Sequence, residues 1–472
     1  MSVASQSAGN AQNPDRSALV IGCVASILLF AALLRLFGVS LLTPALVLGV
    51  AALLWTAFRH PTFCLGAILA FMPIDPLAII LARFFGPPFM LSDAFKACDR
   101  IILLLIACVL LWRNGIKLKT PDWLLLGCFG LAVARLAFGG ELVPLLYDFD
   151  FMIAYIAGRA TVLTVSQQEL WARRAVWIVA VLSVLGMAEV FIIGEGPRTL
   201  LYLAAAEGST EGGALNGTYH AEGFMGLRES STMIGPLQFG ALCMVVLIVW
   251  WVYRRSPLPA AMIASGMICT LSRSAWMGTA VAIPILAAVM HQKKRLLLYA
   301  ALALALFMAS IPVVGLDDFL SATVKGQEAS AQGHQESLVA GLTYVLGHPF
   351  GAGPGNAGAF AFKNDSYVVW TENSYLELAA EYGIAISVFF VGFLVSALRM
   401  LWLQRTQLTY VAVGLLVGFS AIMMVVPIHH VFSLGSWVWF PVGLAVRTSL
   451  APGMQPSPPH GFTAGTVEHS VT

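Results

Sequence analysis

The sequence predicts an all-α, polytopic integral membrane protein with about 14 transmembrane helices (range about 12–14). Hydrophobic residues make up 59% of its 472 positions and charged residues 11%, and the mean hydropathy is +0.83. A soluble globular domain carries about 25% charged residues. Apolar runs of nearly twenty residues, long enough to cross the hydrocarbon core, recur from end to end. The net charge of +2, without a basic patch, excludes an obvious nucleic-acid surface.

The apolar runs can be placed in order because polar or basic residues separate them. The predicted spans are 17–36, 42–58, 62–82, 99–112, 122–138, 148–165, 175–194, 232–253, 257–271, 274–290, 296–315, 376–398, 408–427 and 432–449. The first sixteen residues are polar and lack the basic region and cleavage site of a signal peptide. We therefore expect the first run to be a retained helix.

Basic residues in the short loops set the orientation of such a chain. With the N-terminus inside, every inner loop is basic; these loops carry Arg59, Arg113, Lys117, Lys119, Arg173, Arg174, Arg254, Arg255, Lys293, Lys294, Arg295, Arg399 and Arg405. The outer segment 83–100 is an exception, with Arg83, Lys96 and Arg100 beside two aspartates. The pattern predicts both termini inside.

This topology places two long loops, 195–231 and 316–375, on the outer side, the second directly before the third-last helix. The predicted membrane domain is 17–450. The Ser-, Pro- and Gly-rich tails 1–16 and 451–472 are expected to be disordered and cytoplasmic.

The stretch GHPFGAGPGN, residues 347–356, lies in the second outer loop. Pro349 biases His348 toward extended backbone, and Gly351, Gly353 and Gly355 allow positive φ and close backbone approach. Successive amides in such a stretch can form an anion-binding concavity. A histidine can take a hydroxyl proton at neutral pH, although a lone loop histidine is more often simply exposed.

Two arginines are expected at the outer membrane boundary. Arg228 precedes the span that begins at 232, and Arg273 lies in the short turn of TLSRSAW, residues 270–276. The planar guanidinium fork matches phosphate oxygens, so the pair could clamp a lipid pyrophosphate. The alternative is that both side chains only extend to the polar membrane interface, as arginines near the ends of transmembrane helices commonly do.

The stretch TENSYLELAAEYG, residues 371–383, enters the next predicted span. Asn373, Glu377 and Glu381 recur every four residues and share one helical face. Carboxylates in the first turns of a transmembrane helix favour a face lining a wet cavity. The alternative is stabilisation of the acids by the helix dipole. Arg159, inside the span 148–165, contacts either lipid or the interface.

No complete metal-binding motif is visible. Seven cysteines lie in or beside apolar runs without a CxxC spacing, which is typical of small buried residues. His429 and His430 adjoin in an outer turn, but a metal site needs more ligands and none is obvious. We therefore expect no metal and no cofactor.

The order of these motifs resembles the O-antigen ligase and O-antigen polymerase superfamily of bacterial inner-membrane glycosyltransferases. The resemblance covers about residues 220–400: an arginine before an apolar span, an SR turn, a long outer loop with HPFGAGPGN, and ENSYLELAAEYG. It implies an undecaprenyl-pyrophosphate-linked glycan as donor and transfer to a hydroxyl at the periplasmic face. The family arginines correspond to Arg228 and Arg273, and its histidine to His348.

The resemblance also suggests roles and partners. His348 would act as general base, the two arginines would bind the pyrophosphate, and the acids and glycines would line the substrate cavity. The acceptor is another lipid-linked glycan in polymerases and lipid A–core in ligases. A chain-length regulator and a flippase of the same pathway are possible partners, and nucleic acid is not. About fourteen spans favour a polymerase over a ligase.

The main rival of another class is a polysaccharide or lipid-linked glycan transporter. Transporters place ionisable residues near the midplane, between inverted repeats. Here the candidate residues lie at the outer boundary and no repeat is visible, so the sequence favours the glycosyltransferase.

Overall fold

The protein is described here from a computed structural model. The structure describes residues 52, 55–77, 90–194, 231–233, 235–253, 256–298, 300–301, 308, 329–357 and 368–449. The chain divides into two compact units, Met1–Cys64 and Leu65–Thr472. The two predicted tails lie outside the described residues, as does most of the predicted loop 195–231. Every candidate site residue that is described belongs to the second unit.

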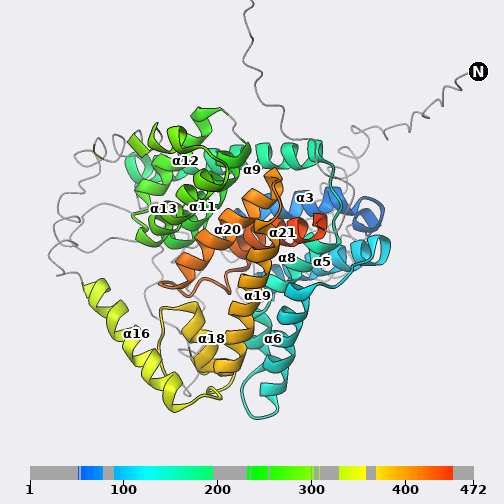
Figure 1. The fold of residues 1–472 in the computed structure, drawn as a ribbon, viewed down its shortest axis with the longest axis vertical. Coiled ribbons are helices and arrows are strands. Elements are labelled where there is room, and N and C mark those ends of the chain that lie inside the picture. Colours follow the sequence, from blue (N-terminus) through cyan, green and yellow to red (C-terminus); the bar gives the residue numbers. More distant parts are fainter. Residues whose placement is uncertain are drawn as a thin grey trace, which may run out of the picture. The chain divides into compact units, whose positions relative to one another are not determined.

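The described part of the chain is helical and holds no strand beyond one isolated bridge between Ala357 and Val369. This confirms the all-α prediction. The helices are α3 (Pro61–Phe71), α5 (Met90–Asn114), α6 (Thr120–Leu136), α7 (Leu142–Asp148), α8 (Phe151–Ala160), α9 (Val165–Ala188) with the π-helix η2 (Glu189–Ile193), α11 (Pro236–Tyr253), α12 (Pro257–Cys269), α13 (Arg273–Val289), α16 (Ala329–Gly347), α18 (Ser374–Tyr382), α19 (Ile384–Trp402), α20 (Gln407–Met423) and α21 (Phe432–Thr448) (Figure 1).

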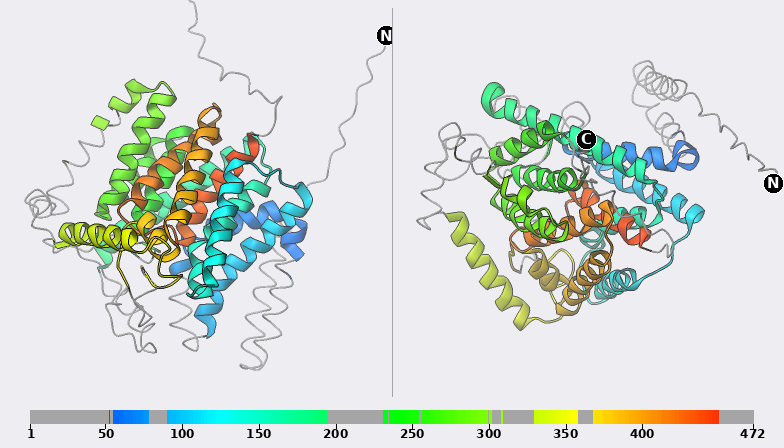
Figure 2. Two further views of the ribbon diagram at one scale, coloured as in Figure 1. Left: turned by 60° about the horizontal axis from the view of Figure 1, so that its bottom comes forward. Right: turned by 45° about the horizontal axis from the view of Figure 1, so that its top comes forward.

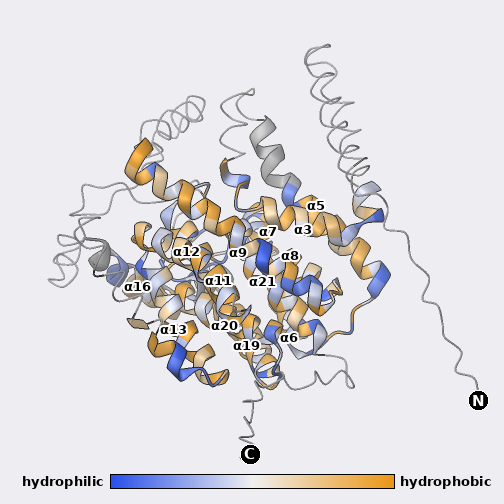
Figure 3. Ribbon diagram, turned by 90° about the horizontal axis from the view of Figure 1, so that it is seen from above, coloured by the Kyte–Doolittle hydropathy of each residue, from blue (hydrophilic) through white to orange (hydrophobic). Residues whose placement is uncertain are grey.

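Three helical segments in the described residues are long and apolar enough to cross a membrane: Val165–Ile193, Pro236–Tyr253 and Ile384–Trp402. Several shorter helices are also apolar, and the hydropathy colouring in Figure 3 shows hydrophobic residues along most of the labelled helices. These helices support a membrane protein. The number of spans, about fourteen, and the orientation of the termini stay predictions.

Three predicted segments differ from the helices found. The predicted span 148–165 corresponds to the short helix α8, with its first residue ending α7 and its last residue beginning α9. The predicted span 376–398 is broken at Gly383, whose φ is +97°. A left-handed backbone angle at glycine ends α18 and redirects the chain into α19. The predicted outer loop 316–375 contains the 19-residue helix α16.

Close backbone contacts join helices from distant parts of the chain. A Cβ added at Gly158 of α8 would lie 2.2 Å from the Phe440 carbonyl oxygen of α21, and one at Gly443 would lie 2.1 Å from that of Tyr155. Small residues permit such close approach in membrane helices. Around the nearby Trp439, aromatic rings fill the space between helices: Phe151, Phe390, Phe393 and Phe419.

Helix α18 is anchored at its beginning. Asn373 is its N-cap, accepting hydrogen bonds from the amides of Tyr375 and Leu376, while its own Nδ2 donates to the carbonyl of Met424 at 2.8 Å. Ser374 Oγ donates to the Val426 carbonyl at 3.0 Å. These contacts fix α18 against the segment that follows α20.

Helix α16 packs on α18 through a small apolar core. That core consists of Val345, Ala357, Val369, Ala379 and Ala380, with Tyr344 and Leu376 against it. Figures 1 and 2 show α16 at the edge of the helix group, and it contacts α18. The packing holds the end of α16, and therefore His348, close to the end of α18.

Candidate functional site

The segment 348–357, called the glycine turn below, caps the C-terminal end of α18. The amide of Ala352 donates to the carbonyl of Ala380 at 2.7 Å, and the amide of Gly353 donates to the carbonyl of Glu381 at 2.7 Å. The last carbonyls of a helix have no partner within the helix. The glycine turn supplies those partners and is thereby fixed in place.

Steric crowding and backbone conformation explain why the glycine turn has glycine at alternate positions. Gly351, Gly353 and Gly355 have φ angles of +73°, +105° and +81°. A Cβ at Gly351 would lie 2.5 Å from the carbonyl oxygen of Glu381, and one at Gly353 would lie 2.7 Å from that of Gly139. The turn is therefore wedged between α18 and the segment after α6, where only glycine fits.

Arg135, near the end of α6, fastens the same turn. Its Nε donates to the carbonyl of Phe350 and its Nη2 donates to the carbonyl of Gly351, both at 3.0 Å. The sequence analysis did not identify this residue. Its position near the outer end of a predicted span was a signal, since two other arginines were chosen on that ground.

His348 directly follows α16 and is exposed. Its ring stacks on Tyr344 with centroids 4.3 Å apart, and its Nδ1 lies 3.2 Å from the Tyr344 carbonyl oxygen. A carbonyl only accepts hydrogen bonds, so this contact favours the proton on Nδ1. Nε2 then carries the lone pair, the form needed in a base.

Arg273 is the first residue of α13 and is half-buried. The turn before it is held by hydroxyl groups: the amide of Ser272 donates to Thr270 Oγ1 at 3.2 Å, and the hydroxyls of Ser272 and Ser274 are 3.2 Å apart. These hydroxyl contacts help to hold the turn that precedes Arg273. Arg228, the second predicted pyrophosphate ligand, lies outside the described residues.

The structure brings Glu381 together with the predicted glycines, whereas Arg273 and His348 belong to different groups of packed helices. Glu381 accepts a hydrogen bond from the amide of Ala357 at 3.3 Å and another from the backbone of Gly355. The amides of the glycine turn therefore hold a carboxylate of the protein itself. Arg273 belongs to a helix that packs on α20 and α11, whereas His348 follows a helix that packs on α18.

Glu377 and Glu381, 4% and 2% exposed, point into a buried polar cluster. Asp148, at the end of α7, accepts a hydrogen bond from Tyr382 Oη at 2.6 Å and shares one with the carboxyl of Glu381. His429, from the turn between α20 and α21, completes this set. Asn373 serves as the helix cap and contacts Met424.

Two adjacent histidines face the acids. His429 Nε2 lies 3.8 Å from Asp148 Oδ1, and His429 Nδ1 lies 3.7 Å from Glu377 Oε2. Burial lowers the pKa of His429 well below its usual value, with a smaller contribution from His430, and burial lowers the pKa of His430 to about 4. Both imidazoles are therefore neutral at pH 7.

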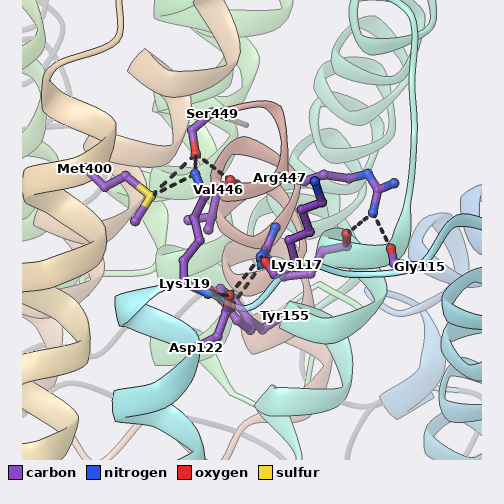
Figure 4. Close-up of polar contacts among 10 residues, drawn as sticks. Gly115, Lys117, Lys119, Asp122, Tyr155, Met400, Val446, Arg447 and Ser449 are labelled. Carbon is purple, nitrogen blue, oxygen red and sulfur yellow. Dashed lines mark hydrogen bonds and ion pairs between the residues drawn. The ribbon is translucent and has the colours of Figure 1, made fainter. Parts of the chain in front are cut away.

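Arg159 contacts neither lipid nor the interface, which corrects the sequence analysis. It is fully buried and paired with Asp122, with Nη2 2.8 Å from Oδ2 and Nε 3.0 Å from Oδ1. Tyr155 Oη donates to the same carboxylate at 2.8 Å. Figure 4 shows Asp122 and Tyr155 together, with Lys119 reaching Ser449 nearby. A buried arginine needs such a partner, so this pair is part of the packing.

A cavity of about 260 Å³ lies elsewhere in the second unit, lined by Arg173, Val176, Trp177, Ser256 and Pro259. None of these residues belongs to the glycine turn or α18. Its position between the beginnings of α9 and α12 gives it no part in the candidate site.

An all-helical chain with apolar spans, an exposed histidine on a fixed glycine turn and buried acids beside it defines a membrane protein with a built polar site. Residues 258–391 match the family model Wzy_C, O-antigen ligase, which confirms the resemblance to the O-antigen ligase and polymerase superfamily. The matched segment includes Arg273, His348, Glu377 and Glu381. No curated protein matches the chain.

Proposed function

We propose that this protein is a metal-independent, inverting glycosyltransferase of the bacterial inner membrane, acting at the periplasmic face. It transfers a glycan from an undecaprenyl-pyrophosphate donor to a hydroxyl group, and we favour a polymerase of O-antigen or exopolysaccharide repeat units. The observation that carries the proposal is the family match over 258–391, a segment that contains Arg273 and the glycine turn. About fourteen predicted spans favour the polymerase.

In the proposed step, His348 Nε2 takes the proton of the acceptor hydroxyl. The acceptor oxygen forms a bond to the anomeric carbon as the bond to the pyrophosphate oxygen breaks, which inverts that centre. Undecaprenyl pyrophosphate leaves with the electron pair, and Arg228 and Arg273 stabilise the charge that develops on it. The contact of His348 Nδ1 with the Tyr344 carbonyl supports the role of Nε2.

The experiment is a surface-polysaccharide gel from a strain lacking the gene, complemented with variants of equal expression. A general base contributes about 10²–10⁴-fold to a rate, so His348→Ala should fail to restore polymer. Arg273→Lys should lose much of the activity, because a point charge replaces a planar fork. His291→Asn is the control, since His291 is an exposed residue in the turn after α13.

The gel also separates the alternatives. A polymerase deletion leaves lipid A–core with a single repeat or abolishes a secreted polymer. A ligase deletion leaves polymer on the undecaprenyl carrier and none on lipid A–core. Full complementation by His348→Ala would contradict the assigned base and favour a transporter.

A further inference from the structure

We infer that Asp148, His429 and His430 bind one divalent transition-metal ion, which fastens the turn between α20 and α21 to α7 and α18. One ligand atom from each of the three residues lies within 4.8 Å of the others. Two imidazoles and a carboxylate are a ligand set suited to Zn²⁺, Fe²⁺, Co²⁺ or Ni²⁺. The inference does not depend on glycosyl transfer.

The spacing suits a shared ion better than a direct hydrogen bond. His429 Nε2 and Asp148 Oδ1 are 3.8 Å apart, too far for a hydrogen bond. Two ligand atoms at about 2.1 Å from one ion lie roughly 3–4 Å apart, depending on the angle between them. The separation of this pair falls within that range, and the three ligand atoms, which lie within 4.8 Å of one another, would draw together by a few tenths of an ångström on binding.

His429 provides an independent observation. It is 1% exposed, and within the described part of the chain neither of its ring nitrogens has a hydrogen-bond partner. Leaving a buried polar atom without a partner costs about 1–3 kcal/mol. With Nε2 on the ion, the proton of the imidazole is on Nδ1, and Glu377 Oε2 lies 3.7 Å from that atom, beyond hydrogen-bond distance. A small approach of these two groups on metal binding would give the carboxylate–histidine–metal arrangement that orients ligands in known metal sites.

Acidic groups gather at the same place. Asp148, Glu377 and Glu381 are all buried, and Glu381 interacts electrostatically with the other two. Carboxylate oxygens and imidazole nitrogens gathered in this way are ligand atoms that divalent metal ions bind.

The ion would act on structure, since Asp148 and His429 are buried and His430 is half-buried, whereas His348 is exposed. Asp148 contacts Tyr382 at the end of α18, and Glu381 of the same helix holds the glycine turn. The sequence predicts no metal, because its cysteines have no ligand spacing and the two histidines have no neighbouring third ligand. The third ligand comes from a distant part of the chain and could not be predicted without the fold.

The test measures metal in the full chain, purified in detergent without chelator. Wild type and His291→Asn should each hold about one ion per chain, whereas Asp148→Asn and His430→Gln should hold less than about a tenth. Size-exclusion profiles establish that each variant is folded. Equal metal in all four proteins would identify an adventitious ion and overturn the proposal.

A second measurement avoids substitutions altogether. Wild-type protein is stripped with 1,10-phenanthroline, and Zn²⁺ or Co²⁺ is added back while thermal unfolding is followed. Stripping should lower the melting temperature by several degrees and one of the ions should restore it. If the purified protein holds no metal and neither ion changes its melting temperature, protons neutralise the cluster and the inference is wrong.

Discussion

At the scale of single residues, Arg135 holds the segment that carries the proposed base. Two carbonyls of the glycine turn, those of Phe350 and Gly351, accept hydrogen bonds from one guanidinium. A hydrogen bond to a charged group contributes about 1.5–3 kcal/mol, and partial exposure of Arg135 places these at the low end. The side chain therefore stabilises the segment that begins at His348.

We predict that Arg135→Gln lowers turnover about tenfold with little change in KM for the lipid donor, since about 1.4 kcal/mol is a factor of ten. The turnover of Arg135→Lys should lie between those of wild type and Arg135→Gln, because an ammonium group can hydrogen-bond one of the two carbonyls more easily than both. The measurement is polymer formation in isolated membranes. Arg174→Gln, an exposed substitution on α9, is the control, and equal activity of Arg135→Gln and this control would contradict the prediction.

Residue types alone identify groups with a recognisable chemical role, but not their neighbours. His348 and Arg273 were predicted from local motifs, and both lie in the segment that matches the family model. His429 was set aside because its carboxylate neighbours, Asp148 and Glu377, come from other helices. Arg159 was misjudged for the same reason, since Asp122 lies on α6.

At the scale of elements, the glycine turn connects three helices. Its amides donate hydrogen bonds to the last carbonyls of α18. Gly353 lies against the backbone of Gly139, in the segment that follows α6. Helix α16 ends directly before it. The alternate glycines follow from this crowding and from positive φ, rather than from mobility.

Gly353→Ala is therefore expected to abolish most activity. A Cβ there would lie 2.7 Å from the Gly139 carbonyl oxygen, at a φ of +105°. Such a strained backbone costs about 1–3 kcal/mol before the clash is counted. Gly347→Ala is the matched control: it is helical, has no atom within 4 Å of its added Cβ, and should leave activity intact. Polymer gels and melting temperatures measure the activity and stability of the two variants. An equal loss of activity in both variants would contradict the prediction that the effect arises from the clash at Gly353.

Helices could be predicted from the sequence where they coincide with a long apolar segment, and could not where the helix is rich in polar residues. The apolar spans 232–253 and 408–427 correspond to α11 and α20. Helix α16, ASAQGHQESLVAGLTYVLG, is rich in small and polar residues and was interpreted as loop. Its stability comes from packing Val345 on α18, a tertiary effect that propensity does not contain.

At the scale of the whole chain, one basic residue of the segment that departs from the charge pattern is held by local contacts. Arg100, on the predicted outer side, donates from Nε to Asp150 Oδ2 at 2.9 Å and lies 3.5 Å from Asp99 Oδ1. Its guanidinium also stacks over the rings of Tyr147 and Phe432. These contacts give Arg100 a structural role within the helix group, and the orientation of the chain stays a prediction that needs a direct test.

Helix α19 allows that orientation to be tested. Its 19 residues span about 28 Å at 1.5 Å per residue, near the hydrocarbon thickness. The amide of Ile384 at its beginning donates to the Pro349 carbonyl at 2.9 Å, so the glycine turn lies at one end and Leu403 caps the other. Phe350 and Leu403 are 82% and 78% exposed. If α19 crosses the membrane, these two residues must lie on opposite sides.

We predict that Phe350→Cys, in a background without native cysteines, reacts with a membrane-impermeant maleimide added to spheroplasts. Leu403→Cys should react only after the membrane is permeabilised, because it lies between Arg399 and Arg405 in a basic inner loop. The cysteine-free parent is the control for background labelling. The reverse pattern would invert the topology and place His348 in the cytoplasm, away from a periplasmic donor. Labelling of both residues without permeabilisation would show that α19 does not cross the membrane.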